Sequence, residues 1–217
     1  MRYSSIRKCD ISNGEGVGVS IFLQGCSLHC EGCFNIDTWD FDGGKELTDE
    51  VINYFIDELA IKPHIKHISI LGGEPLHDRN VLDTLDLIFK IRDRNIYDAK
   101  IWLWSGFTLN SIIKNNADYV ASTIFDPIIY SGHRVYLPDI NNPQEWKKYI
   151  DRSKYDAFCF VDYFIDGPFI ESLKDFNLKF RGSSNQRIID VKETLKKIES
   201  DYDFSHYCQY DTLLSDY

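Results

Sequence analysis

Short apolar runs alternate with segments of helical periodicity along the first half of this 217-residue chain. Three short runs are predominantly apolar and are expected to be buried strands: residues 17–23, 65–71 and 101–104. Between them, residues 48–59 and 78–89 repeat apolar side chains at helical spacing, with Thr48 and Asp78 as expected N-caps. This rhythm predicts an α/β fold with a mostly parallel sheet and right-handed crossovers.

The second half of the chain is less regular. Further elements are expected as a short helix at 108–114, a helix capped by Asn142 and ending near Ile150, strands at 157–165 and 188–191, and a helix to about residue 200. We predict one domain over residues 1–200, with an insertion at about 117–156. Residues 201–217 form an acidic, tyrosine-rich tail with little periodicity.

Charge and hydropathy exclude several classes of partner. The 34 acidic residues outnumber the 24 basic ones, and the net charge of −10 leaves no general basic field for nucleic acid or an anionic membrane. No stretch approaches the roughly 20 uncharged apolar residues of a membrane span. The first ten residues lack the apolar stretch of a signal peptide. We therefore expect a cytoplasmic protein that binds neither nucleic acid nor a membrane.

Half of the six cysteines fall within eight residues, at Cys26, Cys30 and Cys33. In a reducing compartment such a cluster indicates a metal site rather than a disulfide framework. A structural zinc usually takes four protein ligands in two separated pairs, and the sequence has no second pair. A [4Fe–4S] cubane held by three thiolates keeps one iron open for a substrate. Spacing alone leaves a zinc or electron-transfer site, completed by Cys9 or His29, as an alternative.

Chemically distinctive segments follow each of the first three expected strands. The cysteines follow the first, Gly72-Gly73-Glu74 the second and Ser105-Gly106 the third. Because the carboxyl ends of parallel strands share one edge of a sheet, these segments should meet at one ligand site. Gly72 and Gly73 permit close backbone approach to a ligand, although an ordinary strand-to-loop turn would also use them.

Five segments, in the correct order, resemble those of the radical S-adenosylmethionine (SAM) enzymes, and within them the anaerobic ribonucleotide reductase activases. They are residues 25–35, with the spacing Cys-x3-Cys-x2-Cys, 37–39, 72–75, 166–169 and 181–187. Gly32 before the third cysteine and Phe34 after it match the activases, whereas many other radical SAM enzymes have an aromatic residue before that cysteine. The likeness covers about residues 15–115 and 157–200.

This resemblance implies a fold, two cofactors and a set of binding residues. The fold would be a partial, open (β/α) barrel, in which Cys26, Cys30 and Cys33 hold one [4Fe–4S] cluster. SAM would chelate the fourth iron and contact further residues of the loops, expected at Gly32, Cys33, Phe34, Gly72, Gly73 and Glu74. Glu74 or nearby carbonyls would accept hydrogen bonds from the SAM ammonium group.

The resemblance also implies a reaction and its partners. In the family, an electron from the cluster cleaves SAM to methionine and a 5′-deoxyadenosyl radical, which takes hydrogen from a glycine of the large reductase subunit. The expected partners are therefore that subunit and an electron donor such as flavodoxin. Two alternatives remain: activation of another glycyl radical enzyme of the pyruvate formate-lyase type, or a non-catalytic iron–sulfur or zinc protein.

Some side chains near these motifs have no settled role in the sequence. Arg181, Asn185 and Arg187 would pair with the SAM carboxylate, hold the partner's glycine loop, or cap a turn. Trp39 is close enough to the cysteine loop to shield a cluster. The remaining cysteines are scattered and are expected to be small buried hydrophobes, at Cys9, Cys159 and Cys208.

Overall fold

The computed structural model describes residues 1–94, 96, 99–117, 119–120, 139 and 141–200. Residues 121–138 of the expected insertion and the expected tail at 201–217 therefore lie outside the described residues. Within the described part of the chain, no helix is both long enough and apolar enough to cross a membrane.

Seven strands form one sheet in the order β3-β1-β2-β4-β5-β6-β7. Their bounds are Arg2–Asp10 (β1), Gly18–Leu23 (β2), Lys45–Glu46 (β3), His67–Gly72 (β4), Lys100–Trp104 (β5), Tyr163–Asp166 (β6) and Arg187–Asp190 (β7). The pairs β2–β4, β4–β5 and β5–β6 are parallel, whereas β1 and β7 pair antiparallel with their inner neighbours. The expected open α/β sheet with a parallel centre is confirmed.

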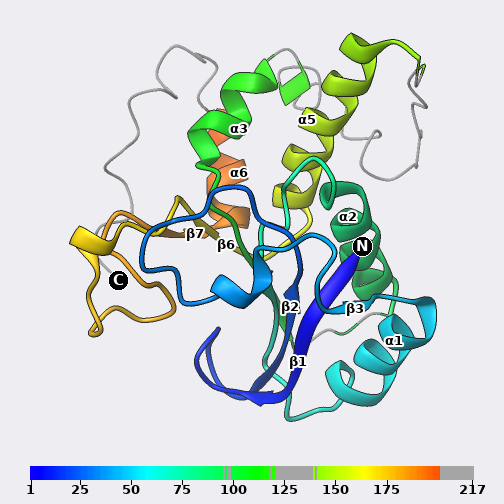
Figure 1. The fold of residues 1–217 in the computed structure, drawn as a ribbon, viewed down its shortest axis with the longest axis vertical. Coiled ribbons are helices and arrows are strands. Elements are labelled where there is room, and N and C mark those ends of the chain that lie inside the picture. The colour runs from blue at the N-terminus through cyan, green and yellow to red at the C-terminus, as the bar shows by residue number, and fades with distance from the viewer. Residues whose placement is uncertain (95, 97–98, 118, 121–138, 140, 201–217) are drawn as a thin grey trace.

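Helices connect the parallel strands and cover one side of the sheet (Figure 1). They are α1 (Asp49–Asn53), which continues as a π-helix over Tyr54–Ala60, α2 (Val81–Asp93), α3 (Leu109–Asn115), α5 (Pro143–Cys159) and α6 (Val191–Ser200). Short 3₁₀ turns at Ile36–Thr38 and Glu171–Leu173 lie in the loops after β2 and β6. Long helices therefore stabilise the sheet on one side while loops shape the other.

Alternation along the central strands separates a core face from a cavity face. In β2, Val19, Ile21 and Leu23 join the hydrophobic core that the helices complete. The intervening Phe22 lines a cavity on the opposite face, as does Trp104 at the end of β5. Because successive strand residues point to opposite faces, one strand both stabilises the fold and supplies the wall of a site.

Two expected helix starts have different outcomes. Thr48 caps α1 as expected, because its Oγ1 accepts a hydrogen bond from the Val51 amide at 3.4 Å. Asp78 does not cap α2, which begins at Val81. The Asp78 carboxylate instead lies 2.6 Å from Lys154 Nζ on α5. Asp78 therefore forms an ion pair with a lysine of another helix and does not cap α2.

The boundaries predicted around residue 157 were wrong. Asn142 caps α5 as expected, with its Oδ1 accepting from the amides of Gln144 and Glu145. The helix continues past Ile150 to Cys159, through the first part of the strand expected at 157–165, and β6 begins only at Tyr163. Ala157 and Phe158 are buried about two turns beyond Ile150, which extends a helical apolar stripe.

The longest strand, β1, was not expected from the sequence. Its residues are mostly polar and half-buried or exposed, so they lack both an apolar run and a regular alternation. The strand exists because it pairs antiparallel with the fully buried β2. Pairing with a buried neighbour, rather than local preference, therefore decides this element.

Candidate functional site

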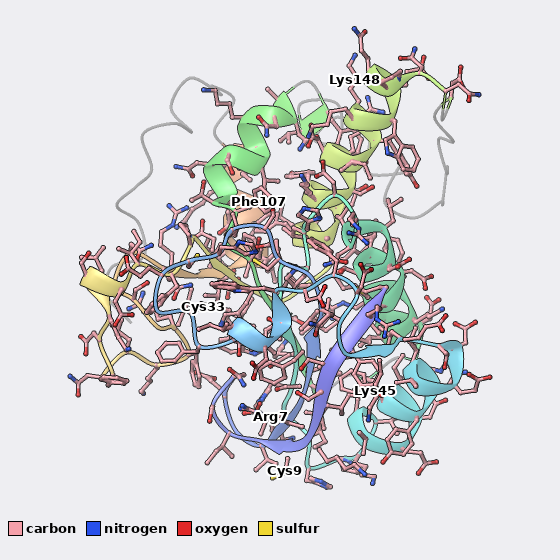
Figure 2. All side chains as sticks on the ribbon, viewed as in Figure 1. Arg7, Cys9, Cys33, Lys45, Phe107 and Lys148 are labelled. Atoms are coloured by element: carbon pink, nitrogen blue, oxygen red, sulfur yellow. The ribbon has the colours of Figure 1, made fainter. Side chains whose placement is uncertain are left out.

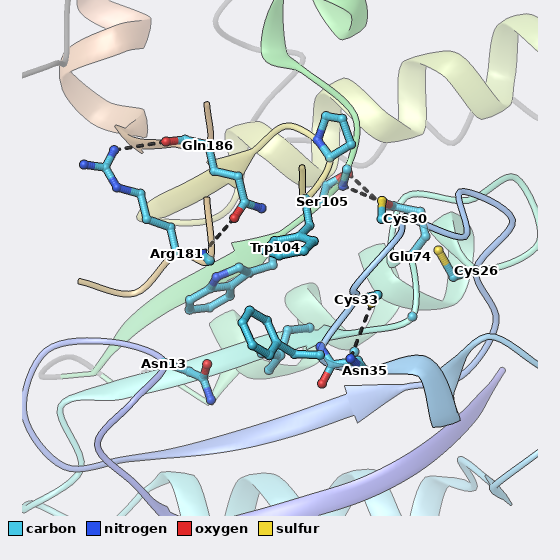
Figure 3. Close-up of a pocket in the computed structure, with 18 of the residues that line it drawn as sticks. Asn13, Cys26, Cys30, Cys33, Asn35, Glu74, Trp104, Ser105, Arg181 and Gln186 are labelled. Atoms are coloured by element: carbon cyan, nitrogen blue, oxygen red, sulfur yellow. Dashed lines mark hydrogen bonds between the residues drawn. The ribbon is translucent and has the colours of Figure 1, made fainter. Parts of the chain in front are cut away.

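A cavity of about 700 Å³ lies against the carboxyl ends of the central strands (Figure 3). Its walls come from the β1–β2 loop, the loops after β2, β4 and β5, and the long loop between β6 and β7. Most of the site residues expected from the sequence line it: Cys26, Cys30, Cys33, Phe34, Gly72, Gly73 and Glu74. Gly32 lies beside it in the same loop. The segments predicted to meet at one edge of the sheet therefore do so.

The backbone of the cysteine loop is fixed at its base. The Gly25 amide donates to the Thr38 carbonyl at 2.8 Å, and the Cys26 amide donates to the Trp39 carbonyl at 3.0 Å. Gly25 has a φ of +96°, a conformation that side chains disfavour. These bonds hold the start of the loop against the segment that follows it, so that the loop closes on itself beside the cavity.

The three thiols differ in environment. Cys26 is buried, whereas Cys30 and Cys33 are partly exposed to the cavity. Burial raises the pKa of the Cys26 and Cys30 thiols above the ordinary value. The Asn35 amide donates to Cys33 Sγ at 3.4 Å. Binding of a metal to these thiols would release protons, because thiolates are the ligands.

The arrangement of the cysteines fits a cluster better than a single ion. Among the described residues, no three Cys, His, Asp or Glu side chains surround one metal-ion position. A cubane binds each thiolate at a different iron, so its ligands need not converge on one point. Cys9, one proposed fourth ligand, is exposed at the opposite end of β1 from the cysteine loop (Figure 2). His29, the other, stacks on Trp39 with ring centroids 4.5 Å apart.

Gly72 and Gly73 pack against backbone, which explains why side chains are absent there. A Cβ on Gly72, whose φ is +111°, would lie 2.7 Å from the Leu23 amide nitrogen, and one on Gly73 would lie 2.5 Å from the Gly25 carbonyl oxygen. The Gly73 amide also donates to the Leu23 carbonyl at 2.9 Å. The glycines therefore bring the loop after β4 onto the base of the cysteine loop.

Glu74 is buried at the centre of the site and ties two loops together. Its Oε1 accepts from the Leu76 amide at 2.9 Å and the Ser105 hydroxyl at 2.7 Å, and its Oε2 accepts from the Gly106 amide at 2.7 Å. Burial raises the pKa of Glu74, and these three donors oppose that rise. The carboxylate thus fixes the loop after β5 and borders the cavity at the same time (Figure 3).

Gly32 and Phe34 flank the third cysteine in different ways. Gly32 has a φ of +71°, and a side chain there would strike the Glu171 carboxylate. Phe34 lines the cavity and is 59% exposed, with its ring 5.2 Å from that of Phe169. The cysteine loop therefore touches the β6–β7 loop on both sides of Cys33.

The 181–187 segment is held by contacts with neighbouring backbone and one acid. Arg181 donates to the Gln186 carbonyl at 3.0 Å, Asn185 to the Pro168 carbonyl at 2.7 Å, and Arg187 to the Asp166 carboxylate at 3.0 Å. The Arg181 side chain points away from the cysteines, toward the Gln186 carbonyl (Figure 3). Holding a turn accounts for the contacts of Arg181 and Asn185, whereas Arg187 forms an ion pair between the paired strands β6 and β7.

Comparison with known proteins identifies the family. The model of the 4Fe-4S single cluster domain matches residues 12–133 and 140–189, which include the cysteine loop and nearly all of the cavity. This chain belongs to that family. The match supports an iron–sulfur cofactor for this chain, and the clustered thiols of the cavity are a donor set that fits such a cofactor.

Similar proteins from bacteria and a phage carry one name. The chain is 29% identical to the anaerobic ribonucleoside-triphosphate reductase-activating protein of Salmonella typhi over 187 residues, covering 86% of this chain and 96% of the relative. The protein of that name from Escherichia coli K12 is 29% identical, with 86% and 96% covered. That of Enterobacteria phage T4 is 28% identical, with 87% and 93% covered. The resemblance inferred from five motifs is thereby confirmed.

Two asparagines at the site of this iron–sulfur protein were not expected from the sequence. Asn80 Nδ2 donates to the carbonyls of Gln24 at 3.0 Å and Glu74 at 3.0 Å, and so joins the cysteine loop to the loop after β4. Asn13 lines the cavity wall remote from Cys26 and Cys30 (Figure 3). Neither belongs to an expected motif. The run Asn13-Gly14-Glu15-Gly16, which would allow a tight loop beside a strand, was the available signal for Asn13.

Proposed function

We propose that this protein activates an anaerobic ribonucleoside-triphosphate reductase as a radical SAM oxidoreductase. One observation carries the proposal: Cys26, Cys30 and Cys33 line the same cavity as Gly72, Gly73 and Glu74, in a chain whose relatives bear that activating name. Three cysteine ligands leave one iron of a [4Fe–4S] cluster open to a substrate. The reductase's large subunit is the proposed partner.

The cluster would supply one electron to bound SAM, giving methionine and a 5′-deoxyadenosyl radical that takes a hydrogen atom from a reductase glycine. The chain's own residues prepare the space for this reaction. Because Gly72 and Gly73 have no side chains, the loop after β4 packs closely against the base of the cysteine loop. Glu74 holds the loop of Ser105 in place through a hydrogen bond. We infer that SAM lies against Gly32, Cys33, Phe34, Gly72, Gly73 and Glu74.

The shape of the sheet supports a macromolecular substrate. We propose that it is a partial (β/α) barrel of the radical SAM type, because its parallel centre carries the site at the carboxyl ends of the strands. A barrel closed on all sides would exclude a glycine that belongs to another protein. We further propose that the protein works in the cytoplasm, with a donor such as flavodoxin supplying the electron.

Anaerobic reconstitution with iron and sulfide, followed by reduction in the presence of SAM, tests the proposal. We expect methionine and 5′-deoxyadenosine, and a glycyl radical signal by electron paramagnetic resonance when the large reductase subunit is added. A signal with pyruvate formate-lyase and none with the reductase would favour the related activase instead. Absence of deoxyadenosine would refute the radical SAM assignment.

A further inference from the structure

The mouth of the cavity carries an apolar rim. Six of the eleven large apolar side chains that are exposed in the described residues lie on the cysteine loop or the β6–β7 loop: Leu28, Phe34, Ile36, Ile170, Leu173 and Phe176. Of these six, Leu28, Phe34 and Phe176 line the cavity, and Phe176 is 83% exposed. Exposed apolar side chains gathered beside a site, rather than scattered singly, mark a surface that another molecule covers.

The rim is continuous across the two loops. The Lys174 ammonium group lies 5.1 Å from the centre of the Phe34 ring and 5.2 Å from that of Phe176. Phe34 in turn makes an edge contact with Phe169. The rings therefore form one surface and do not belong to two unrelated loops.

Charges at the mouth already have partners on the same chain. Lys174 Nζ lies 3.2 Å from the Glu171 carboxylate, and the Arg7 guanidinium lies 3.8 Å from that of Asp10. Asp175 accepts hydrogen bonds from the backbone and side chain of Asn177. Because Lys174 and Arg7 are paired with acids of the same chain and Asp175 already accepts two hydrogen bonds, these groups favour an uncharged segment over an acidic or basic one.

The opposite wall offers a fixed acceptor, the side-chain oxygen of Asn13. Asp10 is 3% exposed and accepts from the Ser20 hydroxyl at 2.6 Å and from Asn13 Nδ2 at 2.7 Å. Burial opposes ionisation of Asp10, but hydrogen bonds from Ser20, Ser12 and Asn13 outweigh it and lower the pKa. An ionised carboxylate only accepts, so it fixes which end of the amide is Nδ2. Among the described residues, Asn13 Oδ1 has no hydrogen-bond partner.

We propose that an extended, uncharged segment of the partner protein crosses this cavity between the apolar rim and Asn13. The segment would place an apolar side chain on Phe34 and Phe176 and donate a backbone N–H to Asn13 Oδ1. An extended polypeptide presents both groups at once, because its backbone N–H groups point along its edges, roughly perpendicular to its side chains. The inference deepens the proposed function, on which it rests, by assigning the residues that hold the segment containing the target glycine.

Affinity of the reconstituted full-length protein for the intact large reductase subunit tests the rim. Phe176→Ser should raise the dissociation constant at least tenfold with an unchanged melting temperature, since the side chain is exposed in the free protein. Ile61→Ser, at a 48% exposed position after the π-helix, is the matched control and should bind as wild type does. Equal affinity of Phe176→Ser and wild type would overturn the docking surface.

A peptide spanning the reductase's radical glycine tests Asn13 separately. N-methylation at one backbone position should weaken binding to wild type about tenfold or more, yet leave binding to Asn13→Ala unchanged, because the variant has already lost the acceptor. If N-methylation at every position affects the two proteins equally, the Asn13 contact is wrong. Failure of the proposed function has a different signature: the reduced wild-type protein, incubated with SAM in the absence of any partner, would form no deoxyadenosine.

Discussion

At the scale of single residues, the three clustered cysteines differ from Cys9 in where they lie. Cys26, Cys30 and Cys33 line one cavity, whereas Cys9 is exposed at the far end of β1. We predict that Cys30→Ala, reconstituted anaerobically, retains well below the roughly four irons per chain of a cubane and forms no deoxyadenosine. Iron analysis and product chromatography measure both quantities.

Cys9→Ala supplies the control for that experiment. It removes a thiol of the same chemistry from the end of β1 that lies away from the cysteine loop. Iron content and deoxyadenosine formation should match those of wild type. A cluster that survived in Cys30→Ala but not in Cys9→Ala would reassign the ligands and contradict the site described above.

Glu74 makes hydrogen bonds within the fold that do not depend on any contact with SAM. Glu74→Gln replaces one acceptor oxygen by an NH2 group, which then faces either the Gly106 amide or the donors from Leu76 and Ser105. A buried donor left facing another donor costs about 1–3 kcal/mol. We predict a loss of unfolding free energy of that order, measured by urea denaturation. Unchanged stability would mean that these hydrogen bonds contribute nothing to the fold.

Residues with a characteristic chemistry, such as the clustered cysteines, were predictable from the sequence. Residues that only position other residues through hydrogen bonds were not. Cysteine spacing and the Gly72-Gly73-Glu74 run identified most of the cavity lining in advance. Asn80 acts through side-chain contacts to residues 56 and 6 positions away along the chain. Such contacts depend on tertiary placement, for which an isolated asparagine gives no local signal.

At the scale of elements, α5 contains a buried acid whose ionisation opposes folding. Burial raises the pKa of Asp156 to about 6 from the ordinary 3.8, although its contacts with Tyr119 and Arg152 oppose the rise. The folded state therefore holds this proton more tightly than the unfolded state. Its stabilising effect is complete below pH 3.8 and is lost as the pH rises through 6.

We predict that Asp156→Asn is more stable than wild type at pH 8, by up to about 3 kcal/mol. Asparagine keeps an acceptor for the Tyr119 hydroxyl, 3.0 Å away in the wild type, without a buried charge. The advantage should shrink as the pH falls from 8 toward 4, which denaturant titrations at several pH values would reveal. Asp86→Asn, on the exposed side of α2, should show no such trend.

The N-cap of α5, Asn142, was predicted correctly from the sequence, and its contribution to stability can be measured. Asn142 Oδ1 accepts from the amides of Gln144 at 3.1 Å and Glu145 at 3.4 Å. Asn142→Ala should lower the unfolding free energy by about 1 kcal/mol, whereas Asn142→Ser should restore most of it, because serine also caps helices. Equal stability of all three proteins would show that this end of α5 is not coupled to global unfolding.

Element ends proved harder to predict than element types. The apolar run that begins at Ala157 has no internal feature that distinguishes a buried strand from the last turns of a buried helix. Helix α5 packs along α2 and buries that stretch, and a strand follows only from Tyr163. Contacts with another helix, absent from any local pattern, therefore decided the boundary.

For the whole molecule, the order of the strands explains why distant motifs form one site. Parallel pairing of β2, β4, β5 and β6 brings the loops that follow them to one edge, where the cavity lies. Alternation of strands and helices was sufficient to predict this meeting. The antiparallel β1 and β7 at the flanks carry weaker patterns, and they leave the described sheet open rather than joined at its edges.

The central claim is that three cysteines hold a cluster and leave one iron free for SAM. The most direct measurement is the electron paramagnetic resonance spectrum of the reconstituted, dithionite-reduced protein before and after addition of SAM. We predict that SAM changes the cluster signal, because it becomes the fourth ligand. A spectrum of the intact reduced cluster that is identical with and without SAM would show that the fourth position is already filled, and would contradict the account.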